Sequence, residues 1–393
     1  MKTYHFRRLL MALCSVLLLV SCSSSGGGIG GTGIISRGTV SAHGSIFVNG
    51  TEFDTSNAVI MVNGLEVGTG DQFVLDYLDI GKVVLVEGTG DMDDIIAVAN
   101  RVTYHDNVVG PVESIVDIPP TTKEIVVLGQ RVILNVLTKF KETAFDTIAQ
   151  DDLVEVSGLV DDTGAIRATF LGKTGVFVPG NIVGVTGFIV NLDVDLKIFE
   201  INDLTVGYSE IDPGDLPEGF ANGLWVEVEG TLDVAGGEMT AESVELGDGM
   251  GDGDSDQIEV FGFVTDVVSD FKFTVGNQVV QLDANTEFVD GDPTDILPGV
   301  KLEAEGYLED GILFADEVEF WGPDQIEVEG LVTDIASDSE FTVGDQVVQT
   351  DGETVFEPED LDIVVGMMIE VKGVPVDIEH SILFADKVSF EED

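Results

Sequence analysis

The chain has 393 residues, and its 74 acidic residues far outnumber its 17 lysines and arginines, so the formal charge at pH 7 is −57. Hydrophobic residues nevertheless make up 44% of the sequence, which excludes an acidic disordered tail, since such tails lack the apolar surface needed for folding. The length suits about two to four domains. The acidic balance argues against nucleic-acid binding, because affinity for phosphate backbones depends on lysine and arginine.

The N-terminus has the features of a secretory signal peptide over residues 1–21. Basic residues precede an apolar run at 9–20, which is too short for a membrane-spanning helix of about 20 residues. The run ends in Leu19-Val20-Ser21-Cys22, which resembles the lipobox of bacterial lipoproteins. That resemblance implies that Cys22 becomes the N-terminus and carries acyl chains such as palmitate, which attach the protein stably to a membrane. By resemblance to Gram-negative lipoproteins, Ser23 implies the outer membrane. An ordinary signal peptide with a chance cysteine is the alternative.

The two cysteines, Cys14 and Cys22, leave no thiol chemistry for the mature chain. The first is removed with the signal and the second carries lipid, so disulfides, thiol nucleophiles and thiolate metal sites are excluded. Residues 22–36 are rich in serine and glycine, and three of the glycines match the dinucleotide pattern G-x-G-x-x-G. Because no strand precedes them and no helix follows, we interpret this stretch as a flexible tether.

After the tether the sequence repeats with a period of about 70 residues. The last two copies are the clearest, since residues 257–266 read QIEVFGFVTD and residues 325–334 read QIEVEGLVTD. Two glycines mark each copy. The first glycines are Gly38, Gly110, Gly187, Gly262 and Gly330, and the second are Gly88, Gly158, Gly230, Gly306 and Gly373. We therefore divide the chain into repeats at 37–107 (the divergent one), 108–178, 179–250, 251–322 and 323–393.

Within a copy, apolar and acidic residues alternate with a period of two, as Val328 and Glu327 illustrate. This pattern predicts β-strands with an apolar inner face and an acidic outer face. Asn49-Gly50 and Asn63-Gly64 predict tight hairpins, because both residues of such a turn need a positive φ. In the fourth copy the predicted strands are 258–268, 271–275, 278–283, 300–308 and 312–320, with a link at 293–299. This order indicates an all-β protein of tandem OB-like barrels, and sandwich-like units are the alternative.

The chain also resembles a known family. The lipobox, the tether, the segment GSIFVNG at 44–50 and Phe53-Asp54 are similar to bacterial lipoproteins of the "domain of unknown function 5666". The segments DILPG at 295–299 and EAEG at 303–306 resemble the repeated domain of that family. The resemblance covers nearly the whole mature chain. It implies no assigned activity and no catalytic residues.

Outward acidic pairs are the first candidates for catalysis. They are Glu227 with Glu229, Glu303 with Glu305, and Glu327 with Glu329. Residues i and i+2 on a strand lie about 7 Å apart, which suits the two carboxylates of an inverting glycosidase. The pairs recur at one position in several copies, however, so we predict a solvated surface, whereas catalysis needs one unique, desolvated pair. We therefore expect that the protein is not an enzyme.

A group of aspartates before the fourth copy is the sharpest candidate for ligand binding. It consists of Asp248, Asp252, Asp254 and Asp256. Aspartates at alternate positions suit Ca²⁺, which is the one cofactor that the sequence suggests. The pattern then departs from a calcium loop, because Gln257 replaces the turn glycine and Phe263 replaces the bidentate glutamate. The two interpretations are a flexible acidic linker and a weak cation site.

The two tryptophans are candidates for stacking on a sugar. Trp225 is predicted on a strand and Trp321 at the junction of the fourth and fifth copies. Barrels of this kind do bind oligosaccharides on one face. Packing in a core or between domains is the other role, because a large aromatic side chain buries much apolar surface.

From these features we expect a lipid-anchored, strongly acidic protein of the cell envelope at the outer membrane. We expect it to act as a non-enzymatic binding or scaffolding module for cations, polysaccharide or another envelope protein. The alternatives are an enzyme that acts on polysaccharide through one carboxylate pair, and a passive structural surface protein.

Overall fold

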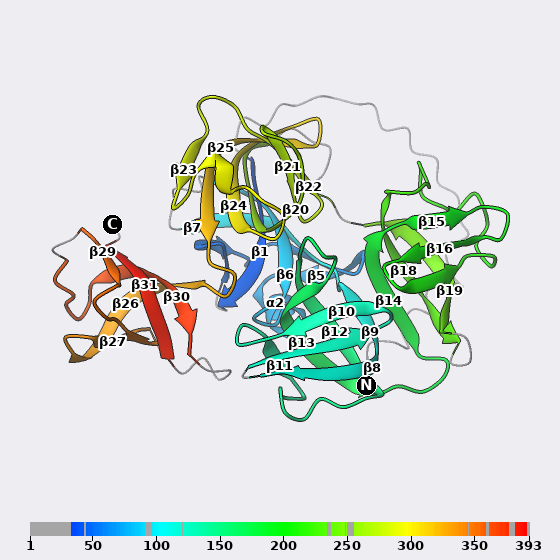
Figure 1. The fold of residues 1–393 in the computed structure, drawn as a ribbon, viewed down its shortest axis with the longest axis horizontal. Coiled ribbons are helices and arrows are strands. Elements are labelled where there is room, and N and C mark those ends of the chain that lie inside the picture. The colour runs from blue at the N-terminus through cyan, green and yellow to red at the C-terminus, as the bar shows by residue number, and fades with distance from the viewer. Residues whose placement is uncertain are drawn as a thin grey trace. The chain divides into compact units, whose positions relative to one another are not determined.

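The computed structural model describes residues 33–42, 45–90, 96–119, 121–233, 237–247, 249, 255–344, 346–358, 361–376 and 382–390. Within these residues, regular structure is almost entirely β-strand (Figure 1). The short helix α2 (Asp71–Tyr77) and the 3-10 turn η1 (Pro293–Asp295) are the exceptions there. No helix among the described residues is long and apolar enough to cross a membrane. The predicted all-β class is confirmed.

One order of strand pairing recurs along the chain, and the segment that we call barrel 4 shows it most simply. β20 (Ser255–Ser269) pairs with β21 (Lys272–Val275), which pairs with β22 (Gln278–Gln281). β22 runs parallel to β25 (Ile312–Trp321), which pairs with β24 (Lys301–Glu309), and β24 returns to β20. The sheet therefore closes into a five-stranded Greek-key barrel, which confirms the OB-like fold over the sandwich-like alternative.

Four other segments share this order. Barrel 1 contains β1 (Gly33–Ala42), β2 (Ile46–Val48), β3 (Thr51–Asp54), β6 (Val83–Thr89) and β7 (Ile96–Tyr104). Barrel 2 contains β8 (Val108–Ile118), β9 (Thr122–Val127), β10 (Gln130–Leu134), β12 (Asp152–Val160) and β13 (Ile166–Val176). In barrel 3 the first strand is divided, and its strands are β14 (Ile182–Phe188), β15 (Val190–Asp193), β16 (Ile198–Ile201), β17 (Leu204–Gly207), β18 (Trp225–Asp233) and β19 (Glu238–Leu246). Barrel 5 contains β26 (Ile326–Ser337), β27 (Glu340–Val343), β28 (Gln346–Gln349), β30 (Met368–Pro375) and β31 (Ile382–Phe390).

Four of the barrels carry an extra strand parallel to their fifth strand, which the alternating pattern did not predict. These strands are β4 (Val59–Val62), β11 (Lys139–Lys141), β23 (Glu287–Val289) and β29 (Val355–Glu357). In barrel 1, β4 also pairs with β5 (Leu65–Thr69) through the turn at Asn63-Gly64. The φ angles of this turn are 47° and 70°, and those of Asn49-Gly50 are 49° and 79°, as the two Asn-Gly pairs predicted.

The second glycine of each repeat lies at a β-bulge. The register of the fourth and fifth strands shifts at Gly88, Gly158, Gly230, Gly306 and Gly373. A Cβ at any of these positions would lie between 1.9 and 2.6 Å from a carbonyl oxygen of the fifth strand. The repeated glycine therefore allows the two strands to approach closely where the barrel wall bends.

Two sheet pairings link barrels to one another. β1 begins at Gly33, inside the stretch 22–36 that the sequence assigned to a tether, and its residues 34–37 pair in parallel with residues 257–260 of β20. β8 pairs with β14, which joins barrels 2 and 3. The first strands of these barrels therefore join neighbouring barrels edge to edge through backbone hydrogen bonds.

Candidate functional site

A glutamate recurs at one position in barrels 2 to 5, on the fourth strand and three residues before the second glycine. These residues are Glu155, Glu227, Glu303 and Glu370. Because side chains alternate along a strand, each points away from the core of its own barrel. Three of the four form an ion pair with a lysine or histidine in the described structure, whereas Glu303 forms none there.

In barrel 2 the partner is Lys82, which comes from barrel 1. Its ammonium group forms an ion pair with Glu155 and lies 4.2 Å from the centre of the Tyr104 ring. The Tyr104 hydroxyl lies 2.6 Å from Asp106 Oδ1 and 2.8 Å from Glu155 Oε1. Burial opposes ionisation of Glu155, but the charge of Lys82 lowers the pKa of this carboxyl overall, whereas burial raises the pKa of Asp106. One buried lysine thus organises a group of acidic side chains.

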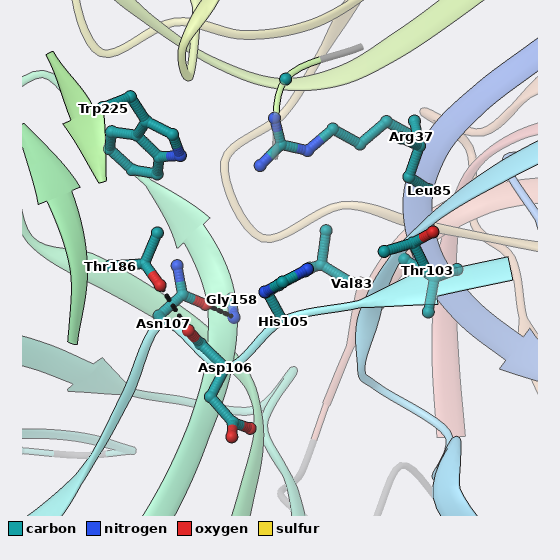
Figure 2. A pocket seen from close by; sticks show the side chains of 12 residues that line it. Arg37, Val83, Leu85, Thr103, His105, Asp106, Asn107, Gly158, Thr186 and Trp225 are labelled. Carbon is teal, nitrogen blue, oxygen red and sulfur yellow. Dashed lines mark hydrogen bonds between the residues drawn. The ribbon is translucent and has the colours of Figure 1, made fainter. Parts of the chain in front are cut away.

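In barrel 3 the partner is His105, whose Nδ1 lies 2.6 Å from Glu227 Oε2. Both side chains are mostly buried. His105 also lines a small cavity of about 50 Å³, and Figure 2 shows it there together with Trp225 and Arg37. That volume suits one or two water molecules, whereas pockets for small-molecule ligands are typically about 300–1,000 Å³.

In barrel 5 the partner is Lys372, two residues after Glu370 on β30. Lys372 Nζ lies 3.5 Å from both Glu370 Oε1 and Glu327 Oε2, and it also pairs with Glu319 of barrel 4. The same ammonium lies 4.4 Å from the centre of the Trp321 ring. Burial opposes the charge, but the surrounding carboxylates raise the pKa of Lys372 above its ordinary value.

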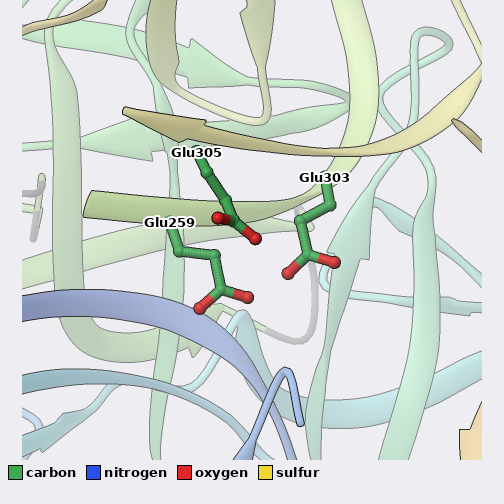
Figure 3. Close-up of side chains that lie close together, drawn as sticks. All are labelled: Glu259, Glu303 and Glu305. Atoms are coloured by element: carbon green, nitrogen blue, oxygen red, sulfur yellow. The ribbon is translucent and has the colours of Figure 1, made fainter. Parts of the chain in front are cut away.

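Barrel 4 is different, because its glutamate meets two more carboxyl groups. Glu259 on β20 and Glu303 and Glu305 on β24 each place one oxygen within 4.8 Å of the others, and Figure 3 shows the three side chains converging. We call these residues the acidic trio. Ser36 of β1 donates a hydrogen bond of 3.0 Å to Glu259 Oε2. Glu303 Oε1 is buried and has no hydrogen-bond partner.

Two members of the trio are deeply buried. Glu259 is 3% exposed and Glu303 is 7% exposed, whereas Glu305 reaches solvent. Burial raises the pKa of Glu259 to about 8. Burial and the neighbouring charge of Glu259 together raise the pKa of Glu303 well above its usual range. The expectation that this outward acidic pair is solvated is therefore wrong for Glu303, which is buried beside Glu259.

Replacing Glu303 with glutamine is expected to stabilise the protein by about 1–2 kcal/mol in buffer that contains a chelator. Glutamine has the shape of the protonated acid and cannot ionise, so the folded protein no longer has to protonate this buried carboxyl, or hold its charge, beside Glu259 and Glu305. The opposite sign is expected for Glu155→Gln at the equivalent position of barrel 2, since that change deprives Lys82 of its partner. Urea unfolding of both variants measures the effects, and a loss of stability in Glu303→Gln contradicts this account.

Of the residues that the sequence singled out for lipid, cation and sugar binding, only the two tryptophans have described side chains. Cys22, Asp248, Asp252 and Asp254 lie outside the described residues, and Asp256 is the second residue of β20, with a side chain that is not described. Trp225 makes an edge-on contact with Phe188 at 4.7 Å between ring centres. Trp321 packs edge-on against Phe261 at 5.1 Å, and its buried Nε1 has no hydrogen-bond partner. Both tryptophans therefore take part in aromatic packing.

A wider hollow of about 520 Å³ lies elsewhere, where barrels 1 and 2 meet. Lys141 in its wall pairs with Asp79 at 2.8 Å, and burial lowers the pKa of Lys139. Ser41 and Ile80 also line it. None of the acidic trio lines either hollow.

A family model with the description "Domain of unknown function (DUF5666)" matches the chain at residues 109–171, 180–245, 261–319 and 329–387. These four matches cover more than half of the sequence. The chain belongs to this family. The DUF5666 domains correspond to barrels 2 to 5, and barrel 1 repeats their strand order outside the matched stretches. The family expected from the sequence is thereby confirmed.

Other comparisons add little to the DUF5666 assignment. No curated protein matches the chain. A solved structure titled "drosophila Unr CSD456" is similar at 14% sequence identity, over 53% of this chain and 96% of that chain, with a TM-score of 0.13.

Sequence reasoning missed the partners of the recurring glutamates. Lys82, His105 and Ser36 come from other segments of the chain, and no local pattern marks them. The sequence did contain one signal: when the fourth and fifth copies are aligned, Glu305 occupies the position of Lys372. Because of this one difference, barrel 4 has an acidic cluster where barrel 5 has an ion pair.

Proposed function

We propose that this DUF5666 protein is a non-enzymatic scaffold of the cell envelope, held at the outer membrane by lipid on Cys22. Its tandem OB-like domains form a binding or structural module. One observation carries the scaffold role: buried ion pairs connect different barrels through the outer faces of their strands. Lys82 connects barrels 1 and 2, and Lys372 connects barrels 5 and 4.

Such contacts favour one arrangement of neighbouring barrels. Separating the barrels would expose Lys82 and Glu155 to water, but any slipped arrangement would leave a buried charge without its partner, at a cost of several kcal/mol. If the barrels are joined in this way, removing Lys82 must destabilise both barrels that it connects. Calorimetry of that variant tests the scaffold proposal, and an unchanged unfolding profile contradicts it.

The alternative, an enzyme that acts on polysaccharide, needs a unique desolvated carboxyl pair within reach of a polymer. Glu259 and Glu303 have the required burial and raised pKa values. A polysaccharide has little access to these two carboxyl groups, because both side chains are less than a tenth exposed and Ser36 of β1 hydrogen-bonds to Glu259. A hydrolytic role is therefore the weaker proposal. Polysaccharide and envelope proteins remain the proposed classes of partner for the exposed acidic surfaces.

The lipid anchor is tested by replacing Cys22 with alanine in cells. The protein is expected to move from the membrane fraction to the soluble fraction, because stable attachment requires the acyl chains. Cys14→Ala is the matched control, since Cys14 lies within the apolar run and is removed with it. The proposal fails if both variants stay in the membrane fraction, or if both leave it. Immunoblots of separated fractions provide the measurement.

A further inference from the structure

We propose that the acidic trio of Glu259, Glu303 and Glu305 binds one Ca²⁺ ion at the contact between barrel 4 and β1. This site differs from the aspartate group before the fourth copy, and it goes beyond the scaffold role.

The comparison of barrels shows that the recurring glutamate is normally neutralised. Glu155, Glu227 and Glu370 each pair with a lysine or a histidine of this chain. In barrel 4 the position of Lys372 is taken by Glu305, so a carboxylate replaces the ammonium group. Among the described residues, neither Glu259 nor Glu303 forms an ion pair with a basic side chain. A cation from solution would supply the charge that the other barrels obtain from the protein.

The geometry suits calcium. One oxygen from each carboxylate lies within 4.8 Å of the others. Two oxygens bound to the same Ca²⁺ at 2.3–2.6 Å can be at most about 5 Å apart, so the three carboxylates need only small side-chain shifts to bind a single ion. Mg²⁺, with bonds of about 2.0–2.1 Å, requires a tighter group, with its ligand oxygens at most about 4.2 Å apart. Three carboxylates without a nitrogen or sulfur donor also disfavour zinc.

Glu303 has a buried carboxylate oxygen without a hydrogen-bond partner. Its side chain is 7% exposed, its carboxylate faces the other two (Figure 3), and Oε1 makes no hydrogen bond. A buried polar atom without a partner costs about 1–3 kcal/mol, so such atoms are rare in folded proteins unless a ligand, ion or water satisfies them. A bound cation would satisfy this oxygen. Ser36 already holds the second oxygen of the neighbouring Glu259 in place.

An ion can reach the acidic trio from solvent, and its binding would affect the contact between two barrels. Glu305 reaches solvent, so an ion can be captured there and shared with the two buried carboxylates. Ser36 and Glu259 occupy paired positions on β1 and β20, two strands that are far apart in sequence. An ion bound to the trio would therefore strengthen the contact between the first and the fourth barrel.

The test is calcium binding to the purified chain, measured by isothermal titration calorimetry and by thermal unfolding in CaCl₂ against NaCl of matched ionic strength. A ligand that binds only the native state raises stability by RT ln(1 + [L]/Kd), so Ca²⁺ at about 100 times Kd is expected to raise Tm measurably. Glu303→Gln is expected to weaken Ca²⁺ binding by about tenfold or more, because it removes one charged ligand. This variant should fold, since it relieves repulsion in the calcium-free protein.

Two control variants make the outcome decisive. Glu370→Gln changes the equivalent residue of barrel 5 and is expected to keep the response to Ca²⁺, because Lys372 already occupies that position. A double replacement of Asp252 and Asp254 with alanine is likewise expected to keep it. The proposal is overturned if CaCl₂ and NaCl act equally, if Glu303→Gln responds like the wild type, or if only the aspartate variant loses binding. Each of these results leaves the lipid anchor and the ion pairs between other barrels unaffected.

Discussion

Replacing Lys82 with methionine is expected to lower the free energy of unfolding by about 3–5 kcal/mol, because the Glu155 carboxylate would stay buried without its counter-charge. The Lys82 side chain is only 6% exposed, so water screens this pair poorly. The lysine also contacts the face of the Tyr104 ring, whose hydroxyl is shared between Glu155 and Asp106. Losing one ammonium group therefore disturbs three other buried polar groups.

Lys141→Met is the matched control, since Lys141 also connects barrel 2 to barrel 1 through an acidic residue. Its pair with Asp79 is half exposed on the lysine side, and such pairs contribute less than about 1 kcal/mol. Differential scanning calorimetry should show a large loss for Lys82→Met and a small one for Lys141→Met. Equal losses would mean that the buried network contributes no more than a surface ion pair. Adding Glu155→Gln to Lys82→Met should restore part of the stability, because it removes the unpaired charge.

The fold could be predicted from the sequence because its determinants are local and recur. The alternation with a period of two predicted which residues of β20 and β24 face the core. The predicted strands 258–268 and 300–308 overlap β20 and β24 respectively. The Asn-Gly pairs predicted their positive φ angles for the same reason, since a turn of this kind depends on two residues only. The short strand β23 was missed, because three residues are too few to establish a period.

The candidate site could not be predicted in the same way. Alternation shows that Glu303 points away from its own barrel, but it does not show what lies on the other side. Nor does it show that β1, more than 200 residues away in sequence, pairs in parallel with β20 and brings Ser36 to Glu259 of the acidic trio. Burial, together with the neighbouring Glu259, gives Glu303 a strongly raised pKa.

The repeated glycines could be located from the sequence, but only the structure explains why glycine stands at these positions. Gly158 and its four equivalents mark the repeat in the sequence, yet none of them has a positive φ that would require glycine for its backbone conformation, and none lies in a turn. Each lies where the fourth strand bulges and comes too close to the fifth for a side chain. Gly158 also donates a backbone hydrogen bond of 2.7 Å to Oδ1 of Asn107, the residue just before β8.

Replacing Gly158 with alanine is therefore expected to cost about 3 kcal/mol and to lower the Tm of the affected transition by on the order of 10 °C. The new Cβ would lie 2.2 Å from the carbonyl oxygen of Arg167 and 2.8 Å from Ala168 Cα, and both are backbone atoms that cannot rotate away. The strands β12 and β13 would have to separate, and the hydrogen bonds on both sides of the bulge would weaken.

Gly175→Ala provides the control within the same strand pair, since a Cβ at Gly175 meets nothing within 4 Å. Its effect is expected to lie within about 0.5 kcal/mol of zero, or to be slightly stabilising, because alanine restricts the unfolded chain more than glycine does. Urea unfolding compares the stabilities of Gly158→Ala and Gly175→Ala, and an unchanged m value shows that both variants unfold in the same way as the wild type. Equal effects would show that the recurring glycine is not required by strand contact. A large loss in Gly158→Ala alone would establish that close contact as the reason why a glycine stands at this position in every repeat.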